Sequence, residues 1–171
     1  MTCTLMLMRH AKSDHGDPSL SDHDRPLNRR GRRDAPLMAD WMARSGRAPQ
    51  RVLCSTAVRT RETLDLMLDR WTEPPDVEFC ESLYLANPES ILWTISGHHM
   101  ESAALLVMGH NPGISMLASA LAQCRLEMPT AAVAVLQVQR KPGETTGTMF
   151  DQIGLQSRSV LDAFATPKTL D

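Results

Sequence analysis

Short apolar runs alternate with longer stretches of helical periodicity along the chain, and this alternation limits the possible folds more than any other feature. The runs are nearly continuous in apolar character, as in strands that are covered by helices on both faces. Five of them are clear: Cys3–Met8, Arg51–Cys54, Val77–Phe79, Ala104–Met108 and Ala131–Val138. The pattern predicts an α/β domain, and a weaker last strand is expected near Thr148–Ile153.

Four helices are expected between these strands, each with an apolar stripe that faces the sheet. Asn28 is a suitable N-cap for the first, and Pro88 suits the first turn of the third. The predicted helices run from Asn28 to about Ser45, from Ala57 to Arg70, from Asn87–Pro88 to Gly97, and from Gly113 to Gln123. The polar segments Asp14–Arg25 and Gln139–Gly147 are expected to be loops.

The chain has 171 residues, of which 42% are apolar, so we expect one domain that spans residues 1–171. It contains no run of about 20 apolar residues, and the prediction is therefore a protein without membrane contact. Arg9 and His10 interrupt the apolar amino terminus, and no basic leader precedes it. These features argue against a signal peptide and predict a cytoplasmic location.

The cysteines and histidines do not have the spacing of a metal site. No two of Cys3, Cys54, Cys80 and Cys124 are separated by two residues, and no histidine lies four residues from another. We therefore predict neither a metal nor another cofactor. The cysteines are expected to be small core residues in a reducing compartment.

Polar and cationic residues follow three of the predicted strands. Arg9 and His10 end the first strand, Arg59 lies just beyond the second, and His110 follows the fourth. In an open parallel sheet, ligands bind at the carboxyl ends of the strands. Two arginines and two histidines at that edge suit a phosphoryl group, because a neutral histidine can attack phosphorus while the cations neutralise its oxygens. Such a site would need no Mg²⁺.

The charge is distributed unevenly along the chain. Residues 1–61 contain 12 Lys and Arg against 6 Asp and Glu, whereas residues 62–171 contain 6 against 14. A basic half can bind nucleic acid, but no DNA- or RNA-binding motif accompanies the arginines of 25–33. We therefore expect no nucleic-acid partner and a solvated basic face, from which Arg25 alone could reach the pocket. Four further histidines are expected to be exposed: His15, His23, His98 and His99.

Four ordered blocks resemble the histidine phosphatase, or phosphoglycerate-mutase-like, superfamily and its SixA-like branch of protein phosphohistidine phosphatases. They are Leu7–Ser13, Arg25–Asn28 with Gly31, Ser55–Thr63 and Gly109–Gly113. The resemblance implies a three-layer α/β/α sandwich around a mainly parallel sheet. It also implies that His10 is a nucleophile that becomes phosphorylated, in a phosphate pocket formed with Arg9, Arg59 and His110. Other residues of the same blocks are expected to bind substrate: Arg25, Ser55, Gly109 and Asn111.

The proton donor is less well defined. Many members of the superfamily use a carboxylate from the loop after the third strand, and Glu81 is the nearest candidate. A phosphomonoester benefits strongly from such an acid, whereas phosphohistidine expels imidazole, a better leaving group.

Three functions remain open at this point. Weak acid assistance and the short chain favour hydrolysis of phosphohistidine on a protein partner. The alternatives are a broad-specificity phosphomonoesterase for small phosphorylated substrates and a non-catalytic phosphate-binding module.

Overall fold

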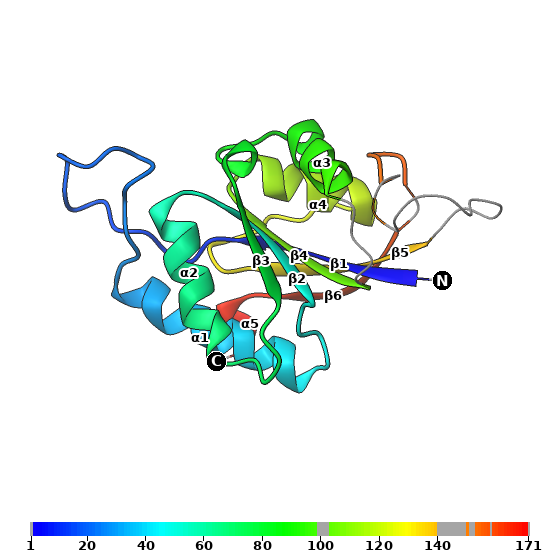
Figure 1. Ribbon diagram of the computed structural model, residues 1–171, viewed down its shortest axis with the longest axis horizontal. Helices are drawn as coiled ribbons and strands as arrows, with labels where there is room; N and C mark the ends of the chain where they lie inside the picture. The colour runs from blue at the N-terminus through cyan, green and yellow to red at the C-terminus, as the bar shows by residue number, and fades with distance from the viewer. Residues whose placement is uncertain (1, 99–102, 140–149, 151–152, 158, 171) are drawn as a thin grey trace.

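A computed structural model describes residues 2–98, 103–139, 150, 153–157 and 159–170 (Figure 1). Six strands form one sheet in the order β3-β2-β4-β1-β5-β6. Their bounds are β1 Thr2–Arg9, β2 Arg51–Ser55, β3 Asp76–Cys80, β4 Ala104–Gly109, β5 Val133–Gln139 and β6 Ser159–Ala165. The five clear strands predicted from the apolar runs are confirmed, with ends that differ by one or two residues.

The sheet is parallel over four strands and antiparallel over the last two. β1 and β2 both run parallel to β4, and β3 runs parallel to β2. β5 pairs antiparallel with β1, and β6 pairs antiparallel with β5. In the register of β1 with β4, Arg9 lies opposite Gly109, so the residues that precede His10 and His110 are neighbours.

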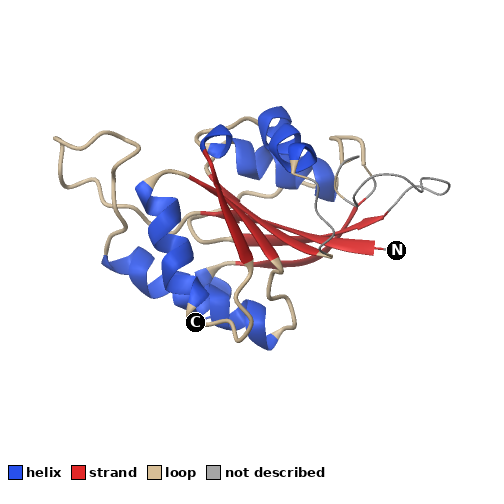
Figure 2. Cartoon of the chain, viewed as in Figure 1, coloured by secondary structure: helices blue, strands red, loops and turns tan. Residues whose placement is uncertain are grey.

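Helices cover both faces of the sheet, with α1 and α2 on one side and α3 and α4 on the other (Figure 2). Their bounds are α1 Arg29–Arg44, α2 Val58–Leu68, α3 Pro88–Gly97, α4 Gly113–Ala122, α5 Pro167–Leu170 and the short 3-10 helix η1 Glu81–Leu83. The expected α/β/α sandwich is therefore confirmed. Neither η1 nor α5 was expected, because a single helical turn is too short for a periodic pattern.

Two hydrophobic cores flank β1, and its side chains alternate between them. Leu5 and Leu7 pack in the core beneath α3 and α4. Met6 and Met8 pack in the core beneath α1 and α2. All four side chains are fully buried, which explains why the strand is continuously apolar in the sequence.

The helix starts follow the expected capping chemistry. The side chain of Asn28 accepts a hydrogen bond from the Gly31 amide at 2.9 Å, and that of Asn87 accepts one from the Ser90 amide at 2.8 Å. Pro88 is the first residue of α3. These contacts confirm Asn28 and Asn87 as the positions where α1 and α3 begin.

The last strand is β6, a strand that the sequence did not predict. The strand expected near Thr148–Ile153 falls mostly on residues outside the described part of the chain, as does the loop expected at Gln139–Gly147. β6 lies at the edge of the sheet with Val160 exposed and Asp162 in its middle. Such a strand lacks the continuous apolar character by which the other strands were recognised.

The first turn of α1 packs closely against the segment after β1. A Cβ atom at Gly31 would lie 2.3 Å from the carbonyl oxygen of Lys12. The Asn28 amide donates to that same oxygen at 3.0 Å. Glycine at position 31 thus allows α1 to hold the backbone just beyond His10.

None of the helices in the described ranges is both long and apolar enough to cross a membrane.

Candidate active site

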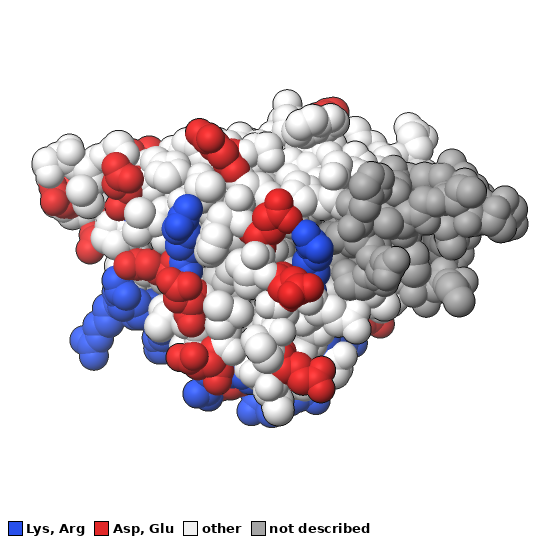
Figure 3. Space-filling model, in the orientation of Figure 1, with Lys and Arg blue, Asp and Glu red and all other residues white. Residues whose placement is uncertain are grey.

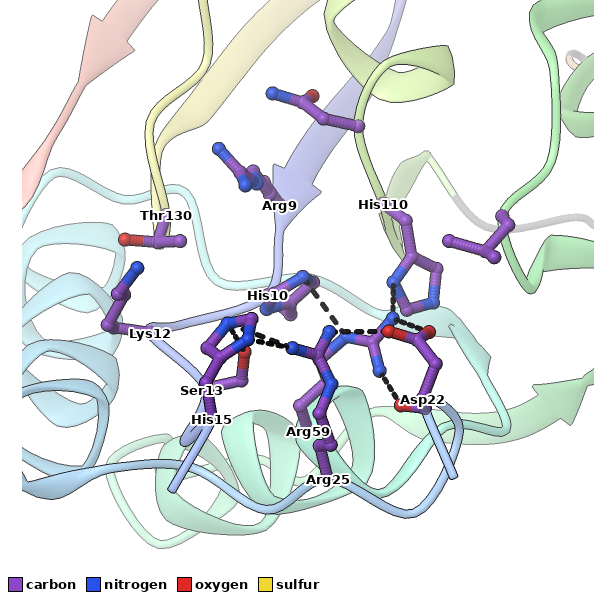
Figure 4. A pocket seen from close by; sticks show the side chains of 12 residues that line it. Arg9, His10, Lys12, Ser13, His15, Asp22, Arg25, Arg59, His110 and Thr130 are labelled. Atoms are coloured by element: carbon purple, nitrogen blue, oxygen red, sulfur yellow. Dashed lines mark hydrogen bonds and ion pairs between the residues drawn. The ribbon is translucent and has the colours of Figure 1, made fainter. Parts of the chain in front are cut away.

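A pocket of about 180 Å³ lies at the carboxyl ends of β1 and β4, where the sequence placed the cationic residues (Figure 4). Its wall is formed by the ends of these strands, the first turn of α2 and the loop between β1 and α1. The residues that line it are Arg9, His10, Lys12, Ser13, His15, Asp22, Arg25, Arg59, Leu85, His110, Asn111 and Thr130.

His10 is held as a neutral imidazole whose ring electron pair is on Nε2, the atom that accepts a hydrogen bond from Arg59. Its Nδ1 lies 2.7 Å from the carbonyl oxygen of Ala11. A carbonyl oxygen only accepts, so the ring proton is on Nδ1. Burial, together with the positive charges of Arg59 and Arg9, lowers the pKa of His10 to about 3. Nε2 is therefore available as a nucleophile at neutral pH.

Arg59 is the centre of the pocket and is only 2% exposed. Its Nε donates to Nε2 of His10 at 3.3 Å, and its Nη2 lies 3.2 Å from Nδ1 of His110. The same guanidinium donates to the carbonyl oxygen of Asp22 at 2.5 Å and to its carboxylate at 3.0 Å (Figure 4). One cation thus fixes both histidines and the loop that faces them.

His110 follows β4 and faces His10, with 5.2 Å between the ring centroids. Because a guanidinium only donates, Nδ1 of His110 accepts from Arg59. Its Nε2 then carries the proton and donates to the Ser55 hydroxyl at 2.7 Å. Burial and the neighbouring His10 and Arg59 lower the pKa of His110 to about 3.

Two further arginines carry buried donors that have no acceptor. The Nη1 of Arg9 donates to the carbonyl oxygen of Met128 at 3.1 Å. Within the described residues, three buried Nε atoms have no hydrogen-bond partner: those of Arg9 and Arg25 in the pocket and that of Arg51 outside it. Burial and the charge of Arg59 also lower the pKa of Arg9. The two unpaired donors in the pocket are available to an oxyanion.

The loop between β1 and α1 adds a carboxylate to this cationic pocket. The Asp22 carboxylate accepts from Arg25 at 2.5 Å, from Arg59 at 3.0 Å and from the Tyr84 hydroxyl at 2.6 Å. The Tyr84 hydrogen bond, with the charges of Arg59 and Arg25, lowers the pKa of Asp22 to about 2. The carboxylate is therefore ionised, and its oxygens accept hydrogen bonds from Arg25, Arg59 and Tyr84.

Sequence comparison places these residues among known proteins. The profile described as "Histidine phosphatase superfamily (branch 1)" matches residues 5–83. The uncharacterized protein ML1117 of Mycobacterium leprae is 38% identical over 144 residues, which cover 77% of this chain and 87% of that protein. The chain belongs to the histidine phosphatase superfamily.

Comparison with solved structures relates this chain to one branch of the superfamily. The "putative phosphohistidine phosphatase SixA" of Agrobacterium tumefaciens has a TM-score of 0.78 and 27% identity, over 96% of this chain and 98% of that one. A protein of the same description from Nakamurella multipartitia has a TM-score of 0.78 and 26% identity, over 98% and 97%. This histidine phosphatase is therefore SixA-like in structure, and its family supports phosphatase activity.

The structure brings together most of the site residues that were expected from the sequence. His10, Arg9, Arg59 and His110 all line the pocket, and so do Arg25 and Asn111. Ser55 lies behind the pocket, where its hydroxyl holds His110. Gly109 acts through its backbone, because its carbonyl oxygen accepts from the His10 amide at 3.2 Å.

Glu81 does not join the phosphatase pocket. It is an exposed residue at the start of η1, and it is absent from the pocket lining. The carboxylate that does reach the pocket is Asp22, from a different loop. Sequence position after the third strand was therefore a poor guide to the acidic group of this site.

Sequence reasoning missed Asp22 and Tyr84 and assigned His15 to an exposed loop. His15 is indeed exposed, yet its ring contacts the Arg25 guanidinium at the pocket. Tyr84 packs edge-on against His110 and supplies the hydrogen bond to Asp22. Asp22 could have been found in the sequence from its position three residues before Arg25, within the polar segment expected to be a loop.

Proposed function

We propose that this protein hydrolyses phosphohistidine on a protein partner through a covalent phospho-His10 intermediate. One observation carries the proposal: the pocket combines a neutral, oriented histidine nucleophile with several cations, but its carboxylate is ionised. Among the described residues that line the pocket, Asp22 is the one carboxylate, and its pKa is about 2. Such a site can bind and accept a phosphoryl group but offers no carboxylic acid to a poor leaving group.

In the first step, Nε2 of His10 attacks the phosphorus of the bound phosphohistidine. The new bond forms between Nε2 and phosphorus while the bond from phosphorus to the substrate imidazole breaks. The substrate ring leaves as a neutral imidazole when its other nitrogen carries a proton. Arg9 and Arg59 stabilise the charge of the phosphoryl oxygens in the transition state, and His110 orients Arg59 by accepting its hydrogen bond at Nδ1.

In the second step, water attacks the phosphorus of phospho-His10 and the bond to Nε2 breaks. The protons of the water remain with inorganic phosphate or pass to solvent. The hydrogen bond from Nδ1 to the Ala11 carbonyl keeps the His10 proton in place, so the ring departs as neutral imidazole. His10 is thus returned to the state in which it began.

The chemistry of the leaving group favours a P–N over a P–O substrate. General acid catalysis contributes about 10²–10⁴-fold in rate when the leaving group is a poor one such as an alkoxide. Asp22 is ionised, and Glu81 lies outside the pocket lining. Imidazole needs little assistance as a leaving group, so the lack of a general acid slows hydrolysis of phosphohistidine least.

The size and charge of the pocket support a protein-borne substrate and a reaction without metal. About 180 Å³ is smaller than the roughly 300–1,000 Å³ of typical small-molecule sites, so most of a substrate must remain outside. Guanidinium groups provide the positive charge that Mg²⁺ supplies in many phosphoryl-transfer enzymes. We therefore expect a chelator to leave the activity unchanged.

The decisive experiment combines trapping of the intermediate with a comparison of substrates. The enzyme is mixed with a protein whose phosphohistidine carries a labelled phosphoryl group, and the reaction is quenched in alkali. We expect label on His10. His98→Gln, a histidine variant remote from the pocket, should label like the wild type, whereas His10→Ala should not. Label that persists in His10→Ala would overturn the covalent mechanism.

The substrate class is tested by kcat/KM on phosphohistidine protein against a panel of phosphomonoesters. We expect a preference of at least about 100-fold for the P–N substrate. Efficient phosphomonoester hydrolysis that is lost in Glu81→Gln would instead support the small-molecule phosphomonoesterase. Tight phosphate binding without turnover on either class would support the non-catalytic module.

A further inference from the structure

A second group of chemically reactive side chains lies outside the phosphatase pocket. Glu78 and Cys80 are on the edge strand β3, and His98 directly follows the end of α3. One donor atom from each of the three residues lies within 4.8 Å of the others. We propose that this carboxylate, thiol and imidazole form a binding site for a divalent ion of the Zn²⁺ class.

The His98 ring is already oriented as it would be in a metal site. Its Nδ1 lies 2.5 Å from the carbonyl oxygen of Thr94, which only accepts, so Nδ1 carries a proton. A hydrogen bond of this kind holds the ring of most metal-bound histidines. It leaves Nε2 directed at the Glu78 carboxylate, 2.9 Å away, and at Cys80 Sγ, 3.9 Å away.

Nε2 and the Glu78 carboxylate need a cation between them. Both atoms are electron-pair donors at hydrogen-bond distance, so either a proton or a metal ion must lie in the contact. A metal ion would replace that proton and also the thiol proton of Cys80, releasing both to solvent. Binding would therefore form Zn–N, Zn–S and Zn–O bonds without any change in oxidation state.

The separations fit a tetrahedral ion after a small adjustment. Zinc bonds of about 2.3 Å to sulfur and about 2.0–2.1 Å to nitrogen or oxygen place ligand atoms about 3.3–3.6 Å apart. The observed separations of 2.9 and 3.9 Å lie on either side of that range. The third separation, between the Glu78 carboxylate and Cys80 Sγ, is within 4.8 Å. A movement of about 1 Å by the half-exposed Glu78 side chain would bring all three atoms to tetrahedral distances.

The ligand types decide which ion is favoured. Thiolate and imidazole select Zn²⁺ over Mg²⁺ and Ca²⁺, which prefer oxygen ligands. Arg51 pairs with the other carboxylate oxygen of Glu78 at 2.8 Å, and its charge weakens attraction for any cation. Three protein ligands leave one coordination position for water, as in open zinc sites.

Sequence spacing could not reveal this site. The search for Cys–Cys and His–His pairs predicted no metal, and it placed His98 among the exposed histidines. In the structure, His98 is half-buried and contacts Cys80 of β3, 18 positions earlier in the chain. The fold thus assembles the cluster from two elements whose sequence patterns contain no metal motif.

The test is a titration of the chelator-treated full-length chain with Co²⁺, a spectroscopic substitute for Zn²⁺. We expect one Co²⁺ per chain and a thiolate-to-cobalt absorption band that Zn²⁺ removes by competition. Cys80→Ser should abolish the band, and His98→Gln should weaken binding at least about 10-fold. Cys124→Ser, which changes an exposed free cysteine elsewhere, should behave as the wild type.

Two results would overturn the proposal. One is the absence of a charge-transfer band at excess Co²⁺ in the wild-type chain. The other is a band of equal strength in Cys80→Ser. Thermal unfolding keeps the variants interpretable, because bound Zn²⁺ should raise the Tm of the wild type but not that of Cys80→Ser. Cys80→Ser should fold without bound metal and retain phosphatase activity, because Cys80 does not line the pocket.

Discussion

Arg59 shows how much of this site depends on one side chain. Its guanidinium contacts His10, His110 and both the backbone and carboxylate of Asp22. A cation that is 2% exposed must be compensated, and here the compensation comes from Asp22. The Asp22 carboxylate thus engages the guanidinium groups of Arg59 and Arg25, the same donors that a phosphoryl group would need.

Replacement of Asp22 should consequently strengthen the binding of oxyanions. In Asp22→Asn the negative charge beside Arg59 and Arg25 is removed while the side chain keeps its size. We expect the Kd for inorganic phosphate, measured by calorimetry, to fall about 10-fold, or about 1.4 kcal/mol.

Asp24→Asn is the matched control for this change. Asp24 lies in the same loop, and its hydrogen bonds go to Ser21 and His23 rather than to Arg59. We expect phosphate affinity to stay within about 2-fold of the wild type. An Asp22→Asn variant with weaker phosphate binding would show that Asp22 mainly aims the arginines.

At the scale of elements, the junction of β1 and α1 positions His10, the proposed nucleophile. Gly31→Ala would place a methyl group 2.3 Å from the backbone oxygen of Lys12, two residues after His10. Backbone cannot move aside as a flexible side chain can, so α1 or the Lys12 segment must shift. We expect a loss of about 1–3 kcal/mol in unfolding free energy and a fall in kcat/KM of at least about 10-fold.

Gly97→Ala provides the control for this prediction. Gly97 is also helical, at the end of α3, and a Cβ atom there would meet nothing within 4 Å. Denaturant unfolding of this variant should match the wild type or exceed it slightly, and its kcat/KM should not change. Equal behaviour of the two alanine variants would refute a role for close packing at Gly31.

For the whole molecule, the two buried histidines couple stability to pH. Burial holds the pKa of His10 and of His110 at about 3, whereas an unfolded chain has a histidine pKa near 6.5. Below about pH 6.5 the unfolded state binds more protons, so stability is complete above that pH and falls with acidification. Each histidine should contribute a loss of up to about 1 kcal/mol per pH unit.

Chemical denaturation at pH 7, 6 and 5 measures this dependence. The double variant His10→Gln, His110→Gln should show a flatter profile than the wild type across that range. Parallel profiles for the wild type and the double variant would exclude the buried pair as the cause.

Part of the excess of basic residues in the amino-terminal third is compensated by acids from the rest of the chain. Arg32 pairs with Glu62, Arg47 with Asp162 and Arg51 with Glu78. Figure 3 shows Lys and Arg side chains next to Asp and Glu side chains on the visible face. The asymmetry along the chain therefore reflects ion pairs with acids that are distant in sequence as well as the pocket arginines.

The sequence alone determined the strands β1 to β5, the helices α1 to α4 and the edge of the sheet at which the pocket lies. Buried parallel strands such as β1 must be apolar throughout, and their carboxyl ends must meet, so Arg9, His10, Arg59 and His110 could be assigned to one site. These features follow from local periodicity, which each segment carries by itself.

Only the tertiary structure decided which loop residues complete the site. Asp22 and Tyr84 meet across 62 positions, Glu81 is absent from the pocket lining, and His98 reaches Glu78 and Cys80 on β3. Loop side chains have no periodic pattern, because their positions depend on turns and on contacts with distant elements. The same reason explains why edge strand β6, which is only partly buried, escaped prediction from the sequence.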